Sequence, residues 1–259
     1  MNSGEYRALF EVEDRHWWFV ALRREIARAL ETFGKRGADF RWRWLDAGSG
    51  TGGLLANLDL PREGMHAGVE VSFEAMRFAR SRELHELVLG SVTALPFGAE
   101  VFDVVTSVDV LCHRDVNEEP ALSEAHRCLK RGGLLVLQVP AFDWLKGEHD
   151  AAVWTNRRYR RREVETMLRR AGFEIAKSFY RVGLVFPAVA LRRFATRGRP
   201  RGESRSDVRP AAPWLDGLLG AVLGAESSLG RLGLRLPFGL SVFCVARKGS
   251  PEERPPRAG

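Results

Sequence analysis

Short apolar runs alternate along the chain with amphipathic stretches, and this alternation predicts strands and helices in turn. Between the runs, apolar residues recur at helical spacing, as Leu122, Ala125 and Leu129 do. Strands that alternate with helices form a parallel sheet covered on both faces. The pattern therefore predicts an α/β fold, with buried strands at residues 40–45, 66–71, 86–89, 101–108, 134–140, 174–180 and 240–246.

The stretch that joins the first predicted strand to the next helix carries the clearest chemical signal. Residues 44–53 read WLDAGSGTGG, so an apolar strand runs directly into glycines, and the run at 54–58 predicts the start of a helix. Glycine lets the backbone turn sharply and leaves no Cβ between main chain and ligand. The N-terminus of the helix offers N–H groups to the same ligand. This order of elements predicts a nucleotide-binding corner.

Two kinds of cofactor use such a corner, and Asp46 distinguishes between them. Gly48, Gly50 and Gly53 fit G-x-G-x-x-G, the dinucleotide pattern, which indicates little on its own. Asp46 places a carboxylate at the end of the strand, where it would repel a pyrophosphate and attract the ammonium group of a cationic ligand. A cationic nucleotide is favoured, and a nicotinamide-dependent oxidoreductase is the alternative.

An acidic residue followed by G-x-G-x-G is motif I of the class I S-adenosylmethionine (SAM)-dependent methyltransferases, and the chain resembles this family at Asp46, Gly48, Gly50 and Gly52. The resemblance covers residues 41–140. It implies a Rossmann-like, doubly wound α/β sheet of seven strands, in which the last two form an antiparallel hairpin and the seventh lies beside the fifth. It also implies methyl transfer from SAM, with a non-catalytic SAM-binding protein as a further alternative.

Further residues are expected to bind SAM. Glu70 ends the second predicted strand, about 20 residues beyond the first motif, where an acidic residue binds ribose hydroxyls in nucleotide-binding folds. Ser91 stands where many family members have an aspartate that contacts the adenine, and the backbone of Val92 is a second candidate for that contact. Asp109 follows the fourth strand, at the edge of the sheet where ligands bind. The expected cofactor-binding set is Asp46, Gly48, Ser49, Gly50, Gly52, Glu70, Val71, Ser91, Val92 and Asp109.

The acceptor side carries weaker signals. An attacking hydroxyl or amine can need a base, and His113 and His149 are the candidates, because both follow strands at the ligand-binding edge. Trp18 lies in an aromatic cluster of the first predicted helix and is expected to contact the acceptor. Arg158 and Tyr159 are expected to do the same, since some bacterial members of the family carry a similar Arg-Arg-Tyr.

Outside the core, the sequence predicts separate N- and C-terminal parts. Residues 6–33 predict a helix that covers the cofactor as a lid. Residues 196–213 predict a mobile loop, and the glycines in 214–234 predict a poor helix or a hairpin packed on the core. The expected units are the lid at 1–37, a SAM-binding core at 38–182, a cap at 183–238, a last core strand at 239–248 and a disordered tail at 249–259.

Charge decides which partners are considered. The 259 residues carry a net charge of +7, and the arginines between 157 and 209 favour anionic partners. No nucleic-acid-binding motif accompanies them, so nucleic acid is not expected. An apolar stripe beside these arginines predicts reversible contact with an anionic membrane; its residues are Leu215, Leu218, Leu219, Val222 and Leu223. The expected acceptor is a glycan- or lipid-linked molecule or a small secondary metabolite.

The cysteines and the termini bear on the compartment. Cys112, Cys128 and Cys244 lie far apart, which favours a reduced setting and no metal site. Cys112 also stands where some relatives have a metal-holding glutamate. No apolar run approaches the ~20 residues needed to span a bilayer, and the polar start of the chain does not resemble a signal peptide. A cytoplasmic protein is expected, with membrane contact only at its periphery.

Overall fold

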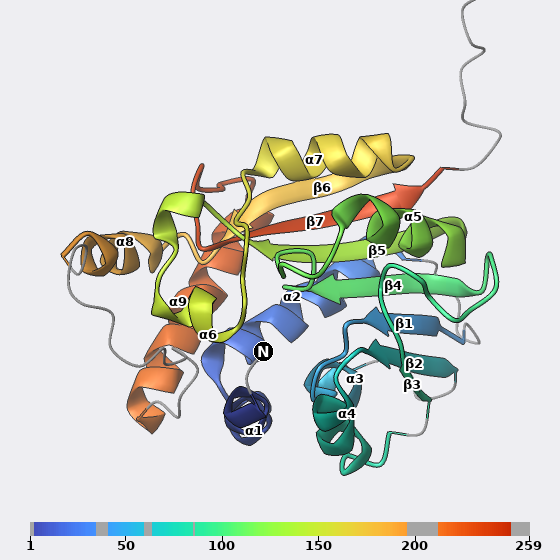
Figure 1. Ribbon diagram of the computed structural model, residues 1–259. Coiled ribbons are helices and arrows are strands. Elements are labelled where there is room, and N and C mark those ends of the chain that lie inside the picture. Colours follow the sequence, from blue (N-terminus) through green and yellow to red (C-terminus); the bar gives the residue numbers. More distant parts are fainter. Residues whose placement is uncertain (1–2, 35–40, 60–63, 85, 196–211, 250–259) are drawn as a thin grey trace, which may run out of the picture.

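A mixed β-sheet forms the centre of the molecule in the computed structural model, which describes residues 3–34, 41–59, 64–84, 86–195 and 212–249 (Figure 1). Within these residues the sheet has seven strands in the order β3-β2-β1-β4-β5-β7-β6. β7 runs antiparallel to both of its neighbours, and the other neighbouring strands are parallel. This confirms the predicted doubly wound sheet. The strands are β1 Arg43–Ala47, β2 Met65–Glu70, β3 Leu87–Leu89, β4 Phe102–Val108, β5 Leu129–Pro140, β6 Phe173–Arg181 and β7 Ser241–Lys248.

Helices cover both faces of the sheet (Figure 1). Two precede the sheet in the chain, and two others, α8 and α9, lie between β6 and β7. The helices are α1 Ser3–Val12, α2 Trp17–Phe33, α3 Gly53–Asn57, α4 Phe73–Arg80, α5 Glu118–Cys128, α6 Glu148–Ala152, α7 Arg161–Arg170, α8 Phe186–Ala195 and α9 Pro213–Arg231, with a short 3₁₀ helix at Asp143–Leu145.

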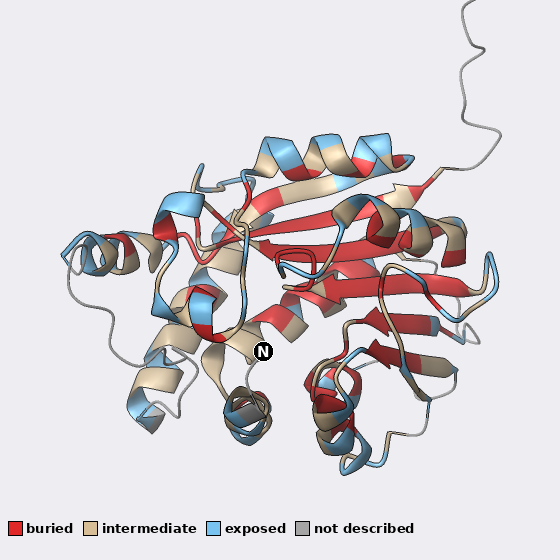
Figure 2. Ribbon diagram, in the orientation of Figure 1, coloured by how far each residue is buried: buried red, intermediate tan, exposed pale blue. Residues whose placement is uncertain are grey.

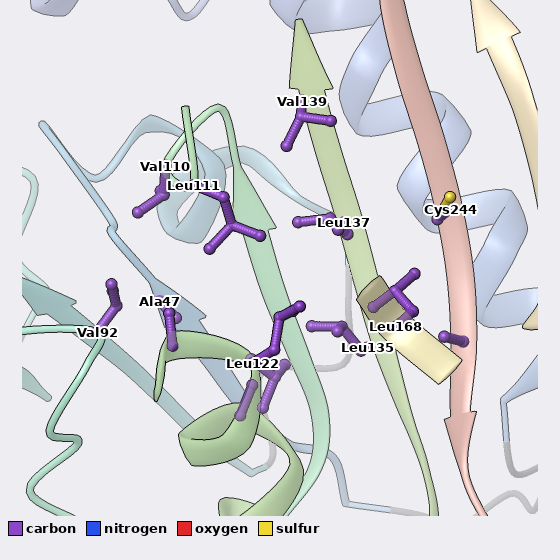
Figure 3. Packing of buried hydrophobic residues seen from close by; sticks show 14 of the residues in the cluster. Ala47, Val92, Val110, Leu111, Leu122, Leu135, Leu137, Val139, Leu168 and Cys244 are labelled. Carbon is purple, nitrogen blue, oxygen red and sulfur yellow. The ribbon is translucent and has the colours of Figure 1, made fainter. Parts of the chain in front are cut away.

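The core consists of two layers because successive side chains of a strand point to opposite faces. On β1, Trp44 packs in the layer that includes α2 and α3, whereas Leu45 packs in the layer that includes α5 and α7. Figure 3 shows the second layer, with Leu122 of α5 and Leu168 of α7 near Leu135 of β5. The central strands are buried along most of their length (Figure 2). Burial on both faces explains their nearly continuous apolar sequences.

The carboxyl ends of β1 and β4 mark the point where the order of the sheet reverses. β1 and β4 are parallel neighbours, yet the chain leaves β1 toward β2 and leaves β4 toward β5, on the opposite side. The helix after β1, α3, packs in one core layer, and α5, which follows β4, packs in the other. The two connections therefore diverge and leave a crevice beyond the strand ends, where ligands bind in such sheets.

The N-terminal part differs from the single helix predicted at 6–33. Two helices, α1 and α2, are separated by a turn at 13–16. His16 is the N-cap of α2, and its Nδ1 accepts from the backbone N–H of Trp18 at 3.3 Å. Arg23 donates to the carbonyl oxygens of Glu13 and Asp14 at 2.8 and 2.7 Å. The side chain of Arg23 thus satisfies the C-terminal carbonyls of the turn, which periodicity alone does not reveal.

The C-terminal cap is more helical than its glycines predict. α9 is one helix from Pro213 to Arg231, and α8 falls in a stretch to which the sequence assigns no element. Contacts with α2 support α9: Asp216 accepts from the Trp17 backbone N–H at 3.3 Å, and Ser227 donates to Glu25 at 2.9 Å. Tertiary packing therefore outweighs the low helix propensity of glycine. The loop predicted at 196–213 and the tail predicted at 249–259 lie almost entirely outside the described residues.

The fifth strand also begins earlier than predicted. Its predicted start is residue 134, whereas β5 begins at Leu129, which pairs with Phe102. The pairing register shifts between Phe102 and Val104, so the glycines at 132–133 form an irregularity inside the strand. Gly132 adopts φ +72°, a conformation that glycine takes without a steric penalty.

Candidate functional site

The glycine loop after β1 is the framework of the candidate site. Gly48 adopts φ +89°, and a Cβ placed there would lie 2.3 Å from the Cγ2 atom of Val110. Gly50 adopts φ +54°, but a Cβ there would meet no atom within 4 Å. Gly48 is therefore needed for packing against the loop after β4. Gly50 faces open space, as expected of the residue over which a ligand lies.

Most N–H groups of this loop are used within the protein. The N–H groups of Gly48 and Ser49 both donate to the carbonyl oxygen of Val69, at 2.8 and 3.0 Å. The Gly50 N–H donates to Oε2 of Glu70 at 2.9 Å, and the Gly52 N–H donates to the Ser49 carbonyl. The loop thus differs from a phosphate-binding loop, which presents a row of N–H groups to an anion.

Asp46 lies beneath the loop, at the end of β1. Its side chain is 3% exposed, and Oδ1 accepts from the Thr106 hydroxyl at 2.7 Å. Burial raises the pKa of Asp46 to about 7; the Thr106 hydrogen bond opposes this shift, and the negative charges of Glu70 and Glu13 add to it. Ionisation of Asp46 is therefore costly, and a cation bound beside it would favour the ionised form.

Glu70, at the end of β2, holds the glycine loop through hydrogen bonds to its carboxylate. Oε1 accepts from the Ser72 N–H at 2.8 Å, while Oε2 holds Gly50. A carboxylate accepts about four hydrogen bonds, so capacity remains for two ribose hydroxyls. Burial raises the pKa of Glu70, against the hydrogen bonds from Ser72 and Gly50. Val71, the next residue, is 73% exposed and leaves the approach to Glu70 open.

A third buried carboxylate, Glu13, was not predicted from the sequence. It lies between α1 and α2, accepts from the Thr51 hydroxyl and pairs with Nη2 of Arg82 at 2.9 Å. A Cβ on Gly53 would lie 2.2 Å from its carboxylate, so Gly53 makes room for Glu13 at the start of α3. The helix N-terminus that was expected to bind the ligand is thus approached by a carboxylate of the protein. A single glutamate after a helix has no sequence pattern by which to recognise it.

The charges around the loop decide which cofactor fits. Asp46, Glu70 and Glu13 are each at most 8% exposed, and Arg82 is shared between Glu13 and Asp14. A pyrophosphate would bring two negative charges to a site where Glu70 and Glu13 already raise the pKa of Asp46. SAM carries a positive sulfonium and an ammonium group. The residues present therefore fit SAM and do not fit a dinucleotide.

A hydrogen-bonded chain of buried polar groups crosses the carboxyl ends of β4, β5 and β6. Asp109, at φ +54°, accepts from Gln138 Nε2 at 3.0 Å, and the Gln138 amide oxygen accepts from Arg181. Arg181 also reaches the Trp18 carbonyl oxygen at 3.5 Å, and its guanidinium lies 5.5 Å from the centre of the Trp18 ring. Oδ1 of Asp109 is buried and has no hydrogen-bond partner.

Gln138 and Arg181 were not identified from the sequence, although a signal exists for both. Gln138 is the single polar residue in the apolar run at 134–140, and Arg181 is a charged residue at the end of a strand. Both are at most 5% exposed. A polar residue at the carboxyl end of a buried strand usually needs a partner, and here the partners are one another.

The segment expected to contact the adenine forms a compact turn after β3. The hydroxyls of Ser91 and Thr93 are 2.8 Å apart, and the Thr93 N–H donates to the Ser91 hydroxyl at 3.2 Å. Val92 is 8% exposed and belongs to the core layer of Figure 3. Adenine contact by Ser91 or by the Val92 backbone stays a prediction.

Ser49 is turned away from the open side of the loop. Its hydroxyl is buried without a hydrogen-bond partner, and it would lie 2.8 Å from a Cβ placed on Gly68 of β2. This position beside Gly68 favours a packing role for the Ser49 side chain.

The residues expected on the acceptor side come together but have different surroundings. Residue 113 pairs with Thr155, so the segment after β5 folds back over the loop after β4. Burial lowers the pKa of the His113 imidazole, against the carbonyl groups of Trp154 and Val153, and leaves it neutral at pH 7. His149 lies on α6, half-buried, in the same folded-back segment.

Arg158 and Tyr159 are engaged inside the protein. Arg158 forms two hydrogen bonds with the Asp150 carboxylate, at 2.7 and 3.1 Å. Tyr159 is fully buried, and its hydroxyl lies 2.8 Å from the Leu111 carbonyl oxygen and 2.9 Å from Glu118. These contacts hold the folded-back segment in place, and in this conformation Tyr159 has no surface to offer an acceptor. Trp18, by contrast, is half-buried beside Arg181.

Comparisons with known proteins agree with this geometry. Residues 45–137 match the family model described as a methyltransferase domain. No curated protein matches the sequence of the chain. Among solved structures, a SAM-dependent methyltransferase from Thermotoga maritima is similar, with a TM-score of 0.58 and 20% identity over 95% of each chain.

Two other solved structures with different reported activities are similar to this chain. A geranyl diphosphate methyltransferase in complex with SAM has a TM-score of 0.56 and 16% identity, over 87% of this chain and 85% of that one. The [4+2]-cyclase SpnF has a TM-score of 0.57 and 20% identity, over 90% of this chain and 83% of that one. At such identities the structures show the shared fold. Together with the match to the methyltransferase-domain model over residues 45–137, they show that the chain is similar to the class I SAM-dependent methyltransferases and shares their fold.

Proposed function

We propose that the protein transfers a methyl group from SAM to a hydroxyl, amine or carbon atom of an acceptor bound beyond the carboxyl ends of β4 and β5. The observation that carries this proposal is the set of three buried carboxylates, Asp46, Glu70 and Glu13, around a glycine loop with open space in front of Gly50. None of the similar structures named above is an oxidoreductase.

The residues around the loop bind and orient the cofactor. When bound, SAM supplies a methyl group on a positively charged sulfur, which a lone pair of the acceptor can attack. Asp46 holds the ammonium group, directly or through water, and Glu70 accepts from the ribose hydroxyls. Gly50 permits close approach of the backbone. The protein therefore contributes chiefly alignment and exclusion of water.

Asp109, which the sequence analysis expects to bind the cofactor, is in this proposal the group best placed to receive an acceptor. Its Oδ1 is buried without a partner, and Gln138 and Arg181 fix the orientation of the carboxylate. Burial raises the pKa of Asp109 to about 6, so the carboxylate is mostly ionised at pH 7.5. It can then accept a hydrogen bond from an N–H or O–H of the acceptor and take its proton. His113, whose pKa is lowered by burial, and His149 are further candidates for the base.

Transfer of labelled methyl groups tests the proposal. The protein is incubated with methyl-tritiated SAM and with separate lipid and water-soluble fractions of a cell extract. Label in a product is expected with the wild-type chain and not with Asp46→Asn. Binding of S-adenosylhomocysteine without label transfer to any fraction would favour the non-catalytic alternative, and the similarity to a cyclase makes that outcome informative.

A further inference from the structure

A cavity of about 230 Å³ lies between α2, β6 and α9, apart from the glycine loop. Most of its wall is apolar, with contributions from all three elements and from the segment after α9: Ala21, Phe179, Val182, Leu223, Leu234 and Leu236. Its volume corresponds to about seven or eight water molecules. Charged side chains also line it, namely Glu25, Arg181, Glu226 and Arg235, so the cavity suits a ligand with both an apolar and a polar part.

The cavity opens to the surface between leucines that are themselves exposed. Leu184 and Leu229 are 43% and 41% exposed, and Leu234 is 64% exposed, although all three line the cavity. Leu232, next to them in the chain, is 77% exposed. Single exposed leucines are ordinary, but a group of them around the mouth of an apolar cavity marks a binding surface. We call these four residues the leucine rim.

The exposed leucines near the cavity differ from the apolar stripe that the sequence predicts to face a membrane. Of the predicted stripe, Leu223 is 5% exposed and lines the cavity, and Leu218 is 53% exposed. The most exposed leucines near the cavity instead follow the end of α9, at 232 and 234. α9 contacts α2, and Leu215, Leu219 and Val222 are half-buried, so Leu218 is the one exposed residue of the stripe.

Basic residues accompany the leucine rim. Arg231 is exposed at the end of α9, where it donates to the Ser228 hydroxyl at 2.9 Å. Arg235 lines the cavity with its guanidinium 3.4 Å from the centre of the Phe179 ring. Arginine beside exposed leucine is the combination that binds an anionic lipid surface, since it adds charge attraction to apolar burial. Among the described residues, no helix is long and apolar enough to cross a membrane.

The cavity is linked to the candidate acceptor site by Arg181. Arg181 lines the cavity and donates to Gln138, whose amide donates to Asp109. Two hydrogen bonds thus separate the cavity wall from the carboxylate that we assign to the acceptor.

We propose that this cavity holds the apolar chain of a lipid-class acceptor, and that the leucine rim and Arg231 dock the protein on an anionic membrane from which the acceptor is taken. The assignment of the acceptor rests on the proposed methyl transfer, whereas the docking does not. A protein partner fits the surface less well, because the small cavity at its centre matches a chain and the arginines match lipid phosphates.

Vesicle flotation tests the docking. Full-length protein is mixed with vesicles of phosphatidylcholine alone or with added phosphatidylglycerol, at low and high salt. Binding is expected only to the anionic vesicles and to weaken with salt. Leu232→Asp combined with Leu234→Asp should weaken it at least about tenfold, and Arg231→Gln about fivefold at low salt. Leu89→Asp, at a 53% exposed leucine on β3, is the matched control and should leave binding unchanged.

A cavity-filling variant tests the chain site. The probe is octyl glucoside below its critical micelle concentration, and its binding is measured by calorimetry. Ala21→Phe adds a ring on the α2 side of the cavity and should weaken probe binding at least about tenfold. Ala225→Phe adds the same ring at an exposed position of α9 outside the cavity and should leave it unchanged. Melting temperature and S-adenosylhomocysteine affinity report whether either variant disturbs the fold or the cofactor site.

The proposal requires both salt-sensitive binding to anionic vesicles and probe binding that Ala21→Phe weakens. Absence of vesicle binding, or equal binding by the leucine variant, would overturn it, and so would probe binding that Ala21→Phe does not weaken. If S-adenosylhomocysteine still binds in these cases, the cofactor site is intact, and the labelled-methyl assay with water-soluble fractions decides the proposed methyl transfer. If S-adenosylhomocysteine does not bind at all, the proposed function fails, while the vesicle result decides the docking independently.

Discussion

At the scale of single residues, the site holds charges that the fold alone does not favour. Asp46 is buried with one hydroxyl partner, and burial raises its pKa to about 7. Asp109 is buried with one unpartnered oxygen, and burial raises its pKa to about 6. Such groups lower the stability of the empty protein, and a bound ligand can recover it. Perturbed carboxyls at the carboxyl edge of the sheet are therefore the residue-level mark of function.

Asp46→Asn should stabilise the empty protein and weaken cofactor binding. The pKa of Asp46 is raised on folding, so its stabilising protonated form is fully present below about pH 4 and is lost as the pH rises through about 7. Thermal melts should show the variant above wild type at pH 8, by about 3 °C for each kcal/mol, and the two should converge toward pH 4. A constant offset at every pH would contradict this account.

The same carboxyl predicts a pH-dependent affinity. A cation binds the ionised form of Asp46, so the affinity of wild type for S-adenosylhomocysteine should fall by up to about tenfold for each pH unit below 7. Asp46→Asn should show a flatter profile between pH 5.5 and 8. Calorimetry over this range provides the measurement, and parallel profiles for the two proteins would assign the titration to another group.

Two glycines of one loop should respond differently to alanine. At Gly48 a Cβ would lie 2.3 Å from Val110, so Gly48→Ala should lower the melting temperature strongly. At Gly50 the Cβ meets open space, so Gly50→Ala should cost only the ~1–2 kcal/mol of a left-handed residue. Its methyl group would still occupy the space expected for the cofactor. S-adenosylhomocysteine affinity should therefore drop in a Gly50→Ala protein that remains folded, and unchanged affinity would remove Gly50 from the binding surface.

At the scale of elements, α1 is joined to the cofactor site by a few specific contacts. The Phe10 ring lies 5.1 Å from that of Phe78 on α4, and the Arg82 guanidinium lies 4.5 Å from the centre of the Phe10 ring. Arg82 also pairs with Glu13 and Asp14. Breaking this attachment should release α1 first and the glycine loop second, since Glu13 holds Thr51.

Arg82→Gln should therefore be among the more harmful substitutions outside the core. It leaves the buried Glu13 carboxylate without its cation, at a cost of ~3 kcal/mol. Hydrogen exchange should rise in residues 3–14, and S-adenosylhomocysteine affinity should fall. Arg114→Gln removes an exposed pair with Asp115 and should change neither quantity. If the double variant Glu13→Gln/Arg82→Gln is no more stable than Arg82→Gln alone, the unpaired carboxylate is not the cause.

The elements also show what the sequence can and cannot predict. The strands and the glycine loop follow from local signals, because apolar runs and glycine turns occupy adjacent positions in the chain. Glu13, Gln138 and Arg181 reach the site from distant segments, and no local spacing relates them. α9 was predicted to be a poor helix because of its glycines, and the contacts that support it come from α2, about 200 residues earlier. Long-range pairing is thus the part that the sequence pattern leaves out.

At the scale of the whole molecule, the sheet separates two tasks. The β1–β2 side carries Asp46 and Glu70, the proposed cofactor residues, and the β4–β5–β6 side carries Asp109, Gln138 and Arg181. α1 contacts α4 on the side of the glycine loop, whereas α2 contacts α9 and borders the cavity on the other side (Figure 1). The arrangement follows from the reversal of strand order at β1 and β4.

Calorimetric titration with S-adenosylhomocysteine, NAD and NADP tests the central claim most directly. Wild type should bind S-adenosylhomocysteine with a Kd in the low micromolar range, ~−8 kcal/mol, and should not bind either dinucleotide. Glu70→Ala should weaken binding by ~1.5–3 kcal/mol, the scale of hydrogen bonds to a charged group. Unchanged affinity in Glu70→Ala, or preferential binding of NAD or NADP, would contradict the assignment of the carboxylate-lined loop to SAM.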